Sequence, residues 1–157
     1  MEHPKDVGDR TTLAVMAALW DAGYAVSVPF GENTRYDLVI DDGQRLARVQ
    51  CKTGRLRKGA IIFKTASTYA HHRAPPQPSR HYRGQIEFFG VYCPETRGVY
   101  VIPIGDVGPS WQAMLRVEPP RNSQRKRVRF AANYQIGTFE VPQVMVTRAL
   151  RASSGAR

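Results

Sequence analysis

The segment from Tyr36 to Gly54 places the strongest constraint on the fold, because its pattern is typical of a β-hairpin. Apolar runs flank Asp42-Gly43, a dipeptide that favours a tight turn between antiparallel strands. Residues two apart in a strand point to the same side, so Gln50 and Lys52 share one face. Asp37 lies near the start of the partner strand, where pairing brings it close to both. The hairpin therefore predicts a carboxylate, an amide and an ammonium group at one edge of a sheet.

The distribution of charge along the chain indicates an anionic partner. The 157 residues carry a formal net charge of +10. Residues 1–42 contain eight acidic and three basic residues, whereas residues 43–86 contain ten basic residues and no acidic one. Residues 116–157 contain nine basic and two acidic residues. Because the basic residues follow the hairpin turn in two blocks, they suit a track along a nucleic-acid backbone better than an evenly solvated surface.

The N-terminal part of the chain predicts one amphipathic helix. Residues 1–8 are polar and are expected to form a flexible arm. Asp9 or Thr11 would cap the helix, and Gly23 would end it. An apolar stripe at i, i+3, i+4, i+7 spacing is expected to face the core, and it consists of Leu13, Met16, Ala17 and Trp20.

The rest of the chain predicts strands and loops within a single domain of residues 1–157. Besides the hairpin, strands are expected at residues 24–29, 60–64, 85–93 and 98–104. A helical turn is expected within residues 106–115, a short helix at 142–151 and a flexible end at 152–157. Surface loops are expected at residues 65–83 and 119–127. A helix followed by strands and mixed elements predicts an α/β (α+β) fold, with a central mixed β-sheet flanked by helices.

The cysteine and histidine residues do not form a recognisable metal-binding pattern. Cys51 and Cys93 lie in apolar runs, so we expect buried free thiols. His71, His72 and His81 have no accompanying cysteine or carboxylate at zinc spacing. The chain also lacks an apolar run of membrane-spanning length and a signal-peptide pattern, which predicts a soluble, cytoplasmic protein without a membrane partner.

The residue types at the hairpin edge suit the hydrolysis of a phosphodiester bond. A divalent metal held by oxygen ligands activates water and stabilises the charge of the transition state and of the leaving oxygen. Asp37 supplies a charged oxygen, while the Gln50 side chain and the Cys51 backbone carbonyl supply neutral ones, a set that suits Mg²⁺ or Mn²⁺. Lys52 would place a cation beside the scissile phosphate. The structural alternative is an ion pair between Asp37 and a nearby arginine, with Gln50 and Lys52 on an ordinary solvated strand face.

Two segments carry a resemblance to a known family. Arg35-Tyr36-Asp37-Leu38-Val39 and Arg48-Val49-Gln50-Cys51-Lys52-Thr53-Gly54-Arg55 resemble the core of the PD-(D/E)XK nuclease superfamily. Within it, the chain is most similar to the small intron-associated, homing-type endonucleases, whose core contains Tyr-Asp-Leu, a hairpin and Val-Gln-x-Lys-Thr. The resemblance extends over roughly residues 4–138. It implies a restriction-endonuclease-like core and the metal-dependent hydrolysis of DNA.

Two positions depart from the pattern of that family. Gln50 occupies the place of the usual acidic residue before x-Lys, and Thr12 occupies a place on the first helix where relatives commonly carry a metal-binding Glu. Asp9, on the same helical face, and Glu32, in the loop before the hairpin, are the candidate substitutes. If neither substitutes, Asp37 is the only charged ligand. We therefore expect weak metal affinity and slow or lost activity.

Three functions are compatible with these features. The leading hypothesis is a Mg²⁺-dependent DNA endonuclease with Asp37, Gln50 and Lys52 as catalytic residues, acting as a dimer or larger assembly if both strands are cut. The alternatives are a catalytically weak or inactive DNA-binding module of the same fold, and an RNA-binding protein. The residues expected to contact the nucleic-acid backbone are Arg48, Arg55, Arg57, Lys58, Lys64, Arg121, Arg125, Lys126 and Arg127.

Overall fold

A six-stranded mixed sheet forms the middle layer of the computed structural model, which describes residues 2–67 and 80–140. In spatial order its strands are β1 (Ala25–Ser27), β2 (Leu38–Asp41), β3 (Leu46–Thr53), β8 (Phe88–Cys93), β9 (Gly98–Pro103) and β11 (Gln135–Thr138). Neighbouring strands are antiparallel except β3 and β8, which are parallel. The sheet is therefore mixed, as expected from the sequence.

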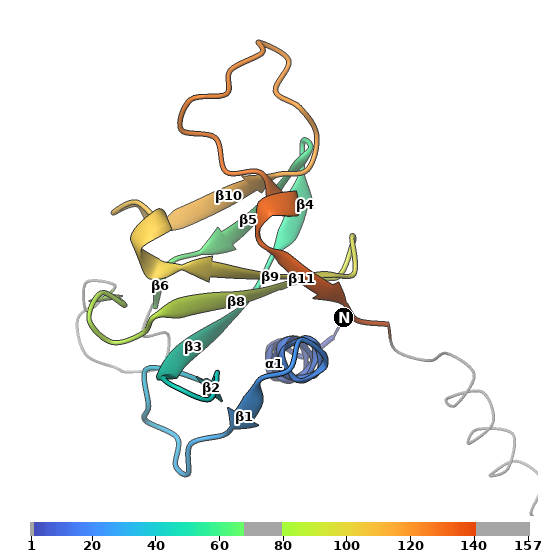
Figure 1. Cartoon of the computed structure of the whole chain (residues 1–157). Helices are drawn as coiled ribbons and strands as arrows, with labels where there is room; N and C mark the ends of the chain where they lie inside the picture. The colour runs from blue at the N-terminus through green and yellow to red at the C-terminus, as the bar shows by residue number, and fades with distance from the viewer. Residues whose placement is uncertain (1, 68–79, 141–157) are drawn as a thin grey trace, which may run out of the picture.

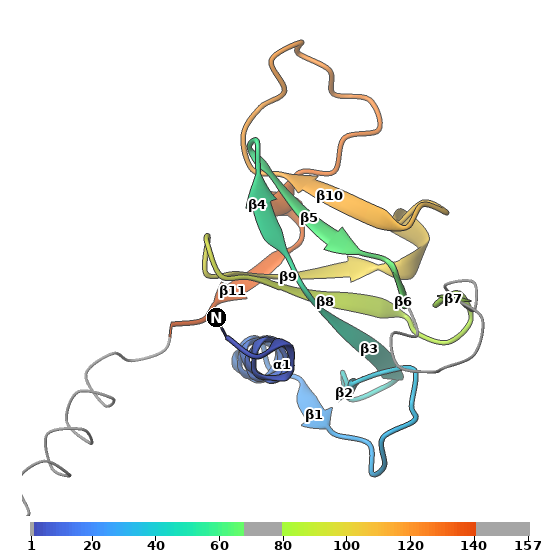
Figure 2. The ribbon, with the colours of Figure 1, turned by 180° about the vertical axis from the view of Figure 1, so that it is seen from behind.

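Two further layers cover the faces of this sheet (Figures 1 and 2). Helix α1 (Pro4–Asp21) packs on one face. A three-stranded antiparallel sheet packs on the other, in the order β10 (Gln112–Arg116), β5 (Ala60–Lys64) and β4 (Arg55–Arg57). One hydrophobic cluster fills the space on each side of the main sheet. The expected α/β fold is confirmed, with the difference that strands rather than helices cover the second face in the described part of the chain.

Helix α1 begins earlier and buries a different face than the sequence indicated. It starts at Pro4, a favoured first position, and the His3 side chain accepts a hydrogen bond from the Lys5 amide at 3.3 Å. The expectations of a flexible arm over residues 4–8 and of a cap at Asp9 or Thr11 are therefore wrong. Leu13 and Trp20 are exposed, and the buried residues are instead Thr11, Ala14, Val15, Ala18 and Leu19.

Close approach between α1 and the main sheet explains which helix face is buried. A Cβ atom added at Gly90 of β8 would lie 2.6 Å from Val15 Cγ1, so the helix and the strand pack more closely than a side chain would allow. Ala14 and Ala18 are also fully or almost fully buried, and a Cβ atom added at Gly137 of β11 would lie 3.5 Å from Ala18 Cβ. The larger Leu13 and Trp20 do not fit such a contact and face outward.

The expected hairpin is formed by β2 and β3, in the register Leu38↔Val49 to Asp41↔Leu46. Gly43 has φ +90°, a value that glycine adopts without steric cost. Asp42 Oδ1 accepts hydrogen bonds from the amides of Gln44 and Arg45 at 2.8 and 2.7 Å. The Asp-Gly turn therefore closes the hairpin as its sequence predicts.

The remaining elements agree only partly with the sequence-based expectations. β5 matches its expected range, β8 and β9 lie within theirs, and β1 is shorter than expected. Residues 112–116 form strand β10 rather than a helical turn, because Ala113 and Leu115 alternate inward with exposed neighbours. Residues 65–83 are not a simple loop, since β6 (Ala66–Ser67) pairs with β7 (Arg80–His81). Residues 142–151 and 152–157 lie outside the described part.

Other elements and features complete the description. Short 3₁₀ helices occupy Ile104–Asp106 and Ala131–Asn133. Cys51 and Cys93 are buried free thiols, as expected. None of the described residues forms a helix that is long and apolar enough to cross a membrane.

Candidate active site

Asp37 directly precedes β2, and its carboxylate lies beside Gln50 of β3. The Asp37 amide donates to the Val49 carbonyl at 2.9 Å, which fixes the backbone of Asp37 next to β3. Asp37 Oδ2 accepts hydrogen bonds from Gln50 Nε2 at 2.7 Å and from the Cys51 amide at 2.8 Å. Burial raises the pKa of the Asp37 carboxyl above its ordinary value, while the Cys51 hydrogen bond and the Lys52 charge act against this. A half-buried carboxylate is therefore held at the hairpin edge.

The three groups expected to bind metal converge on one point. Gln50 Nε2 donates to Asp37 Oδ2 and also contacts the Cys51 carbonyl at 3.3 Å. The amide nitrogen of Gln50 thus lies between a carboxylate oxygen and a carbonyl oxygen. No ion pair within 4 Å among the described residues includes Asp37. The alternative in which Asp37 serves a surface ion pair therefore lacks support.

The side chain of Cys51 points to the opposite face of the main sheet, toward α1. Burial, followed by the nearby charge of Asp37, raises the pKa of the Cys51 thiol, and a side-chain hydrogen bond with Thr12 acts against the shift. Thr12 Oγ1 also donates to the Gly8 carbonyl at 3.1 Å. The helix position that departs from the family pattern therefore lies beside the hairpin, where it carries a hydroxyl instead of a carboxylate.

Neither acidic substitute for that position has a described contact with the hairpin edge. Asp9 is exposed on α1, and Glu32 is exposed in the loop before β2. Among residues 2–67 and 80–140, no group of three or more His, Cys, Asp or Glu side chains is arranged to hold a metal. Among the described residues, Asp37 is the one carboxylate with a contact at this edge, and entry of Asp9 or Glu32 stays a prediction.

Lys52 is held by an aromatic residue that the sequence did not single out for this role. Lys52 Nζ donates to the Tyr82 hydroxyl at 3.1 Å and lies 4.9 Å from the ring centroid. Tyr82 is only 3% exposed, and its ring packs edge-on against Phe89. The guanidinium of Arg35 lies over the same ring, with Cζ 4.1 Å from its centroid. Two cations from the hairpin region therefore contact one buried tyrosine.

Arg35 contacts Tyr82 and also forms hydrogen bonds with β6, with β7 and with the segment that follows β7. It donates to Gln85 Oε1 and to Ser67 Oγ, each at 2.6 Å, and to the His81 carbonyl at 3.2 Å. Arg35 stands two residues before Asp37, so the same side chain also fixes the approach to β2. In the sequence, only the position of Arg35 beside Tyr36-Asp37 pointed to a role near the site. Its contacts could not be predicted, because its partners are 32 to 50 residues away in the chain.

We expect Tyr82→Phe to lower the turnover number of DNA cleavage about tenfold, the cost of one lost hydrogen bond to a charged group, with little change in KM. The ring that Arg35 covers is retained, so the melting temperature should change little. The measurement is steady-state cleavage of a supercoiled plasmid. In a Lys52→Ala background the Tyr82→Phe change should have no further effect; an equal loss in both backgrounds would mean that Tyr82 does not act through Lys52.

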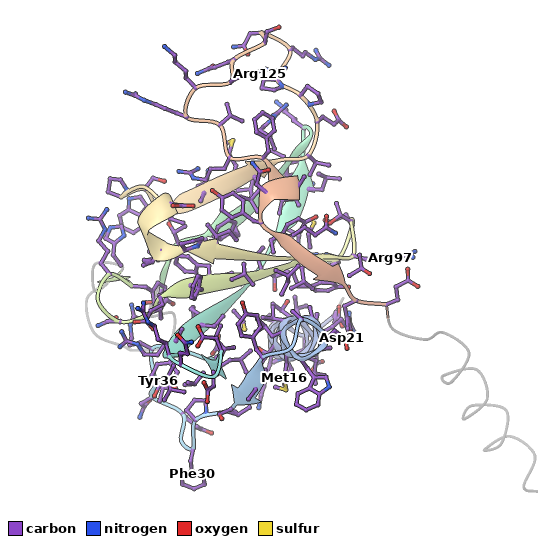
Figure 3. The ribbon with its side chains drawn as sticks, in the orientation of Figure 1. Met16, Asp21, Phe30, Tyr36, Arg97 and Arg125 are labelled. Carbon is purple, nitrogen blue, oxygen red and sulfur yellow. The ribbon has the colours of Figure 1, made fainter. Side chains whose placement is uncertain are left out.

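The basic residues expected to bind nucleic acid occupy different environments. Arg48 forms a two-pronged ion pair with Glu87, at 2.6 and 3.1 Å, so its charge is compensated within the protein. Arg55 lies 4.0 Å from Glu95. The other residues of the set are exposed, and they are Arg57, Lys58, Lys64, Arg121, Arg125, Lys126 and Arg127. Figure 3 shows that Tyr36, beside Asp37, and Arg125 lie at opposite ends of the molecule.

Comparison with known proteins concerns the family and the fold of the whole chain. The PD-(D/E)XK endonuclease family matches residues 2–137. The fold is similar to that of the bacterial homing endonuclease I-Ssp6803I, with a TM-score of 0.67 and 21% identity over 98% of each chain. A Holliday junction resolvase, Hjc of Archaeoglobus fulgidus, has a TM-score of 0.41 and 15% identity over 69% of this chain and 83% of its own. No curated protein matches the chain.

Proposed function

Because the chain belongs to the PD-(D/E)XK endonuclease family and is therefore a phosphodiester hydrolase, we propose that it cuts DNA at the edge formed by Asp37, Gln50 and Lys52. The observation that carries the proposal is the position of the Gln50 amide nitrogen within 3.3 Å of both Asp37 Oδ2 and the Cys51 carbonyl, with Gln50, Cys51 and Lys52 on one strand, β3. The net charge of +10 supports a nucleic acid as substrate.

The homing-type branch of the family is part of the same proposal. It rests on the spacing of Tyr36-Asp37-Leu38 and Val49-Gln50-Cys51-Lys52-Thr53, which resembles the core of intron-associated endonucleases. Similarity in fold to a bacterial homing endonuclease over 98% of both chains is consistent with this assignment. Because one site cuts one strand, we further propose that double-strand cleavage requires two or more copies of the chain.

The donor set at the hairpin edge fits a hard divalent cation. Mg²⁺ or Mn²⁺ prefers oxygen ligands, and Asp37, the Gln50 side chain and the Cys51 carbonyl would hold it. When bound, the cation supplies charge stabilisation at the phosphate and a more acidic water. Gln50 here donates through Nε2, and a half-turn of its amide group would present Oε1 as a ligand instead. With one carboxylate in the set, we propose that metal affinity is weak.

Each residue at the hairpin edge has its own proposed role in cleavage. Asp37 keeps its negative charge at the edge, and the Cys51 amide holds that carboxylate in position through the 2.8 Å hydrogen bond. Lys52 places an ammonium group on the same face, where it orients the attacking water or stabilises charge on the phosphate. Tyr82 holds this ammonium group before substrate arrives. The site therefore combines electrostatic stabilisation with a positioned cation.

We expect Gln50→Glu to raise the affinity of the free protein for Mg²⁺ about tenfold, because a second carboxylate adds attraction that its desolvation only partly offsets. Isothermal titration of Mg²⁺ measures the effect without any DNA. The matched control is Gln44→Glu, which adds the same charge at an exposed position in the hairpin turn. Equal gains in both variants would show that net charge, and not a ligand at position 50, sets the affinity.

A plasmid nicking assay tests the proposed function directly. Supercoiled, linear and branched DNA are incubated with the protein and Mg²⁺ or Mn²⁺, with and without a chelator. Cleavage that requires the metal supports the proposal. Binding without any cleavage under all conditions would favour the second candidate, a catalytically weak or inactive DNA-binding module, for which the hydroxyl of Thr12 in place of a carboxylate is the specific observation.

A further inference from the structure

A basic groove lies at the end of the molecule opposite the hairpin edge. Residues 118–129 arch away from the end of β10 (orange loop at the top of Figure 1). Between this loop, the β4–β5 turn and the outer side of β10 lies a cavity of about 1010 Å³. Its lining includes one acidic residue, Glu118, and five basic ones, Lys58, Arg116, Arg121, Arg127 and Arg129. The cavity is therefore strongly positive.

The groove continues along β10 toward the residues that hold Lys52. A second cavity of about 500 Å³ shares Met114 and Arg129 with the first and extends to Trp111. The ring of Trp111 is 61% exposed and lies 6.3 Å from the ring of His81. His81 directly precedes Tyr82, the hydrogen-bond partner of Lys52. One surface thus connects the basic loop with the neighbourhood of the proposed active site.

The basic side chains of the groove are held in place without being neutralised. Arg116 donates to the carbonyls of Glu118 and Lys58 at 3.2 and 3.3 Å, and Arg129 donates to the carbonyl of Asp106 at 2.7 Å. Within the described part of the chain, none of the five basic residues forms an ion pair within 4 Å. This contrasts with Arg48, whose charge Glu87 compensates. The groove therefore keeps its positive charge for a ligand.

We propose that this groove, from Trp111 to Arg127, holds the phosphate backbone of duplex DNA at a distance from the bond that is cut. This inference rests on the proposed function and adds a second, separate contact with the same substrate. Neutralised phosphates release counterions, so unpaired arginines on a groove supply affinity that does not depend on base sequence. The assignment includes Arg116 and Arg129, and it separates the loop residues that line the groove from Arg125, at the loop tip in Figure 3.

The length of β10 sets the scale of the groove. Five residues of extended chain separate Trp111 from Arg116, which amounts to about 17 Å. One turn of B-DNA is about 34 to 36 Å long. The part of the groove along β10 therefore spans about half a helical turn of one duplex.

The test is the salt dependence of binding to a labelled mixed-sequence duplex of about three helical turns, measured by fluorescence anisotropy in EDTA. The variant is Arg121→Gln/Arg127→Gln, which removes two exposed groove charges. The control is Lys5→Gln/Arg45→Gln, which removes the same charge from exposed positions on α1 and at the hairpin turn. Within the described part of the chain, neither control residue forms an ion pair within 4 Å. The measured quantity is the slope of the logarithm of the binding constant against the logarithm of the salt concentration. The magnitude of this slope should fall by about 0.9 per lost phosphate contact, or about 1.8 in the groove variant, and should change little in the control.

Each outcome decides the proposal. A loss confined to the groove variant, with an unchanged melting temperature, supports it even if the protein cuts no DNA. Equal slopes in the variant and the wild type, or equal losses in the variant and the control, overturn it. A loss of affinity for single-stranded RNA of the same length, with duplex binding unchanged, overturns the assignment to DNA. If the groove variant binds duplex DNA as the wild type does and still cuts it in a metal-dependent way, the role of the groove is overturned and the proposed function is retained.

Discussion

Lys52→Ala is expected to lower DNA cleavage by about 10²- to 10³-fold, the usual cost of removing one group that stabilises charge in the transition state. Lys52 lies on the same strand as Gln50 and points to the same face, with its ammonium group 3.1 Å from the Tyr82 hydroxyl. Binding should change little, because one phosphate contact among many is lost. Single-turnover cleavage of a plasmid, together with anisotropy in EDTA, separates the two effects.

The fold should tolerate this change, since Lys52 is only half-buried and its one described hydrogen bond goes to Tyr82. Lys5→Ala, on the exposed side of α1, is the control for a lost positive charge. If Lys52→Ala cut DNA as fast as the wild type, Lys52 would have no catalytic role and the site would have to be sought elsewhere. If both proteins bound equally and neither cut DNA, the binding-module function would be favoured.

Asp37→Asn is expected to abolish cleavage and, at neutral pH in EDTA, to raise the free energy of unfolding. The first effect follows because asparagine removes the only carboxylate at the converging groups. The second follows because burial raises the pKa of the Asp37 carboxyl, which means that the folded state disfavours its charge. Asparagine keeps an oxygen that can accept from the Cys51 amide while it avoids the charge. The gain should be of the order of 1 kcal/mol.

The pH dependence gives this prediction a definite sign. A group whose pKa is raised in the folded state contributes stability below its unfolded pKa and loses it as the pH rises through the folded value. The stability advantage of Asp37→Asn should therefore be present at pH 7 and shrink when the wild-type carboxyl is protonated. Thermal unfolding over this pH range, with EDTA, measures it. A destabilised Asp37→Asn protein at pH 7 would contradict the assignment.

Asp42→Asn is a matched control, because it should change the free energy of unfolding in the opposite direction. Asp42 is exposed in the hairpin turn and accepts hydrogen bonds from the amides of Gln44 and Arg45, which lower the pKa of its carboxyl. Its contribution to stability is present above the unfolded pKa and disappears as the pH falls through the lowered folded value. The change should therefore weaken the fold at neutral pH without affecting cleavage. The two aspartates of one hairpin would thus respond in opposite directions.

The hairpin and its chemical groups were predictable from the sequence because they depend on short-range rules. Asp-Gly sets the turn, and strand alternation and pairing then put Gln50 and Lys52 on one face and Asp37, one residue before the paired Leu38, close to Gln50. Turn chemistry and strand pairing over fewer than twenty residues leave little freedom for another arrangement. The same local rules failed for α1, where size and spacing favoured Leu13 and Trp20, whereas Val15, which packs against Gly90, is buried instead.

Sequence alone determined the carboxylate, amide and carbonyl at the hairpin edge, and the tertiary structure decided what surrounds them. Tyr82, which contacts Lys52, lies 30 residues away from it in the chain, and Arg116 and Arg129 both line the basic groove although 12 residues separate them. Arg116 and Arg129 are joined by the hydrogen bond from the Arg116 amide to the Arg129 carbonyl at 2.7 Å. Such neighbours come from pairing and burial between distant segments, which no local pattern encodes. A side chain's chemistry is a property of its own residue, whereas its partners are a property of the folded chain.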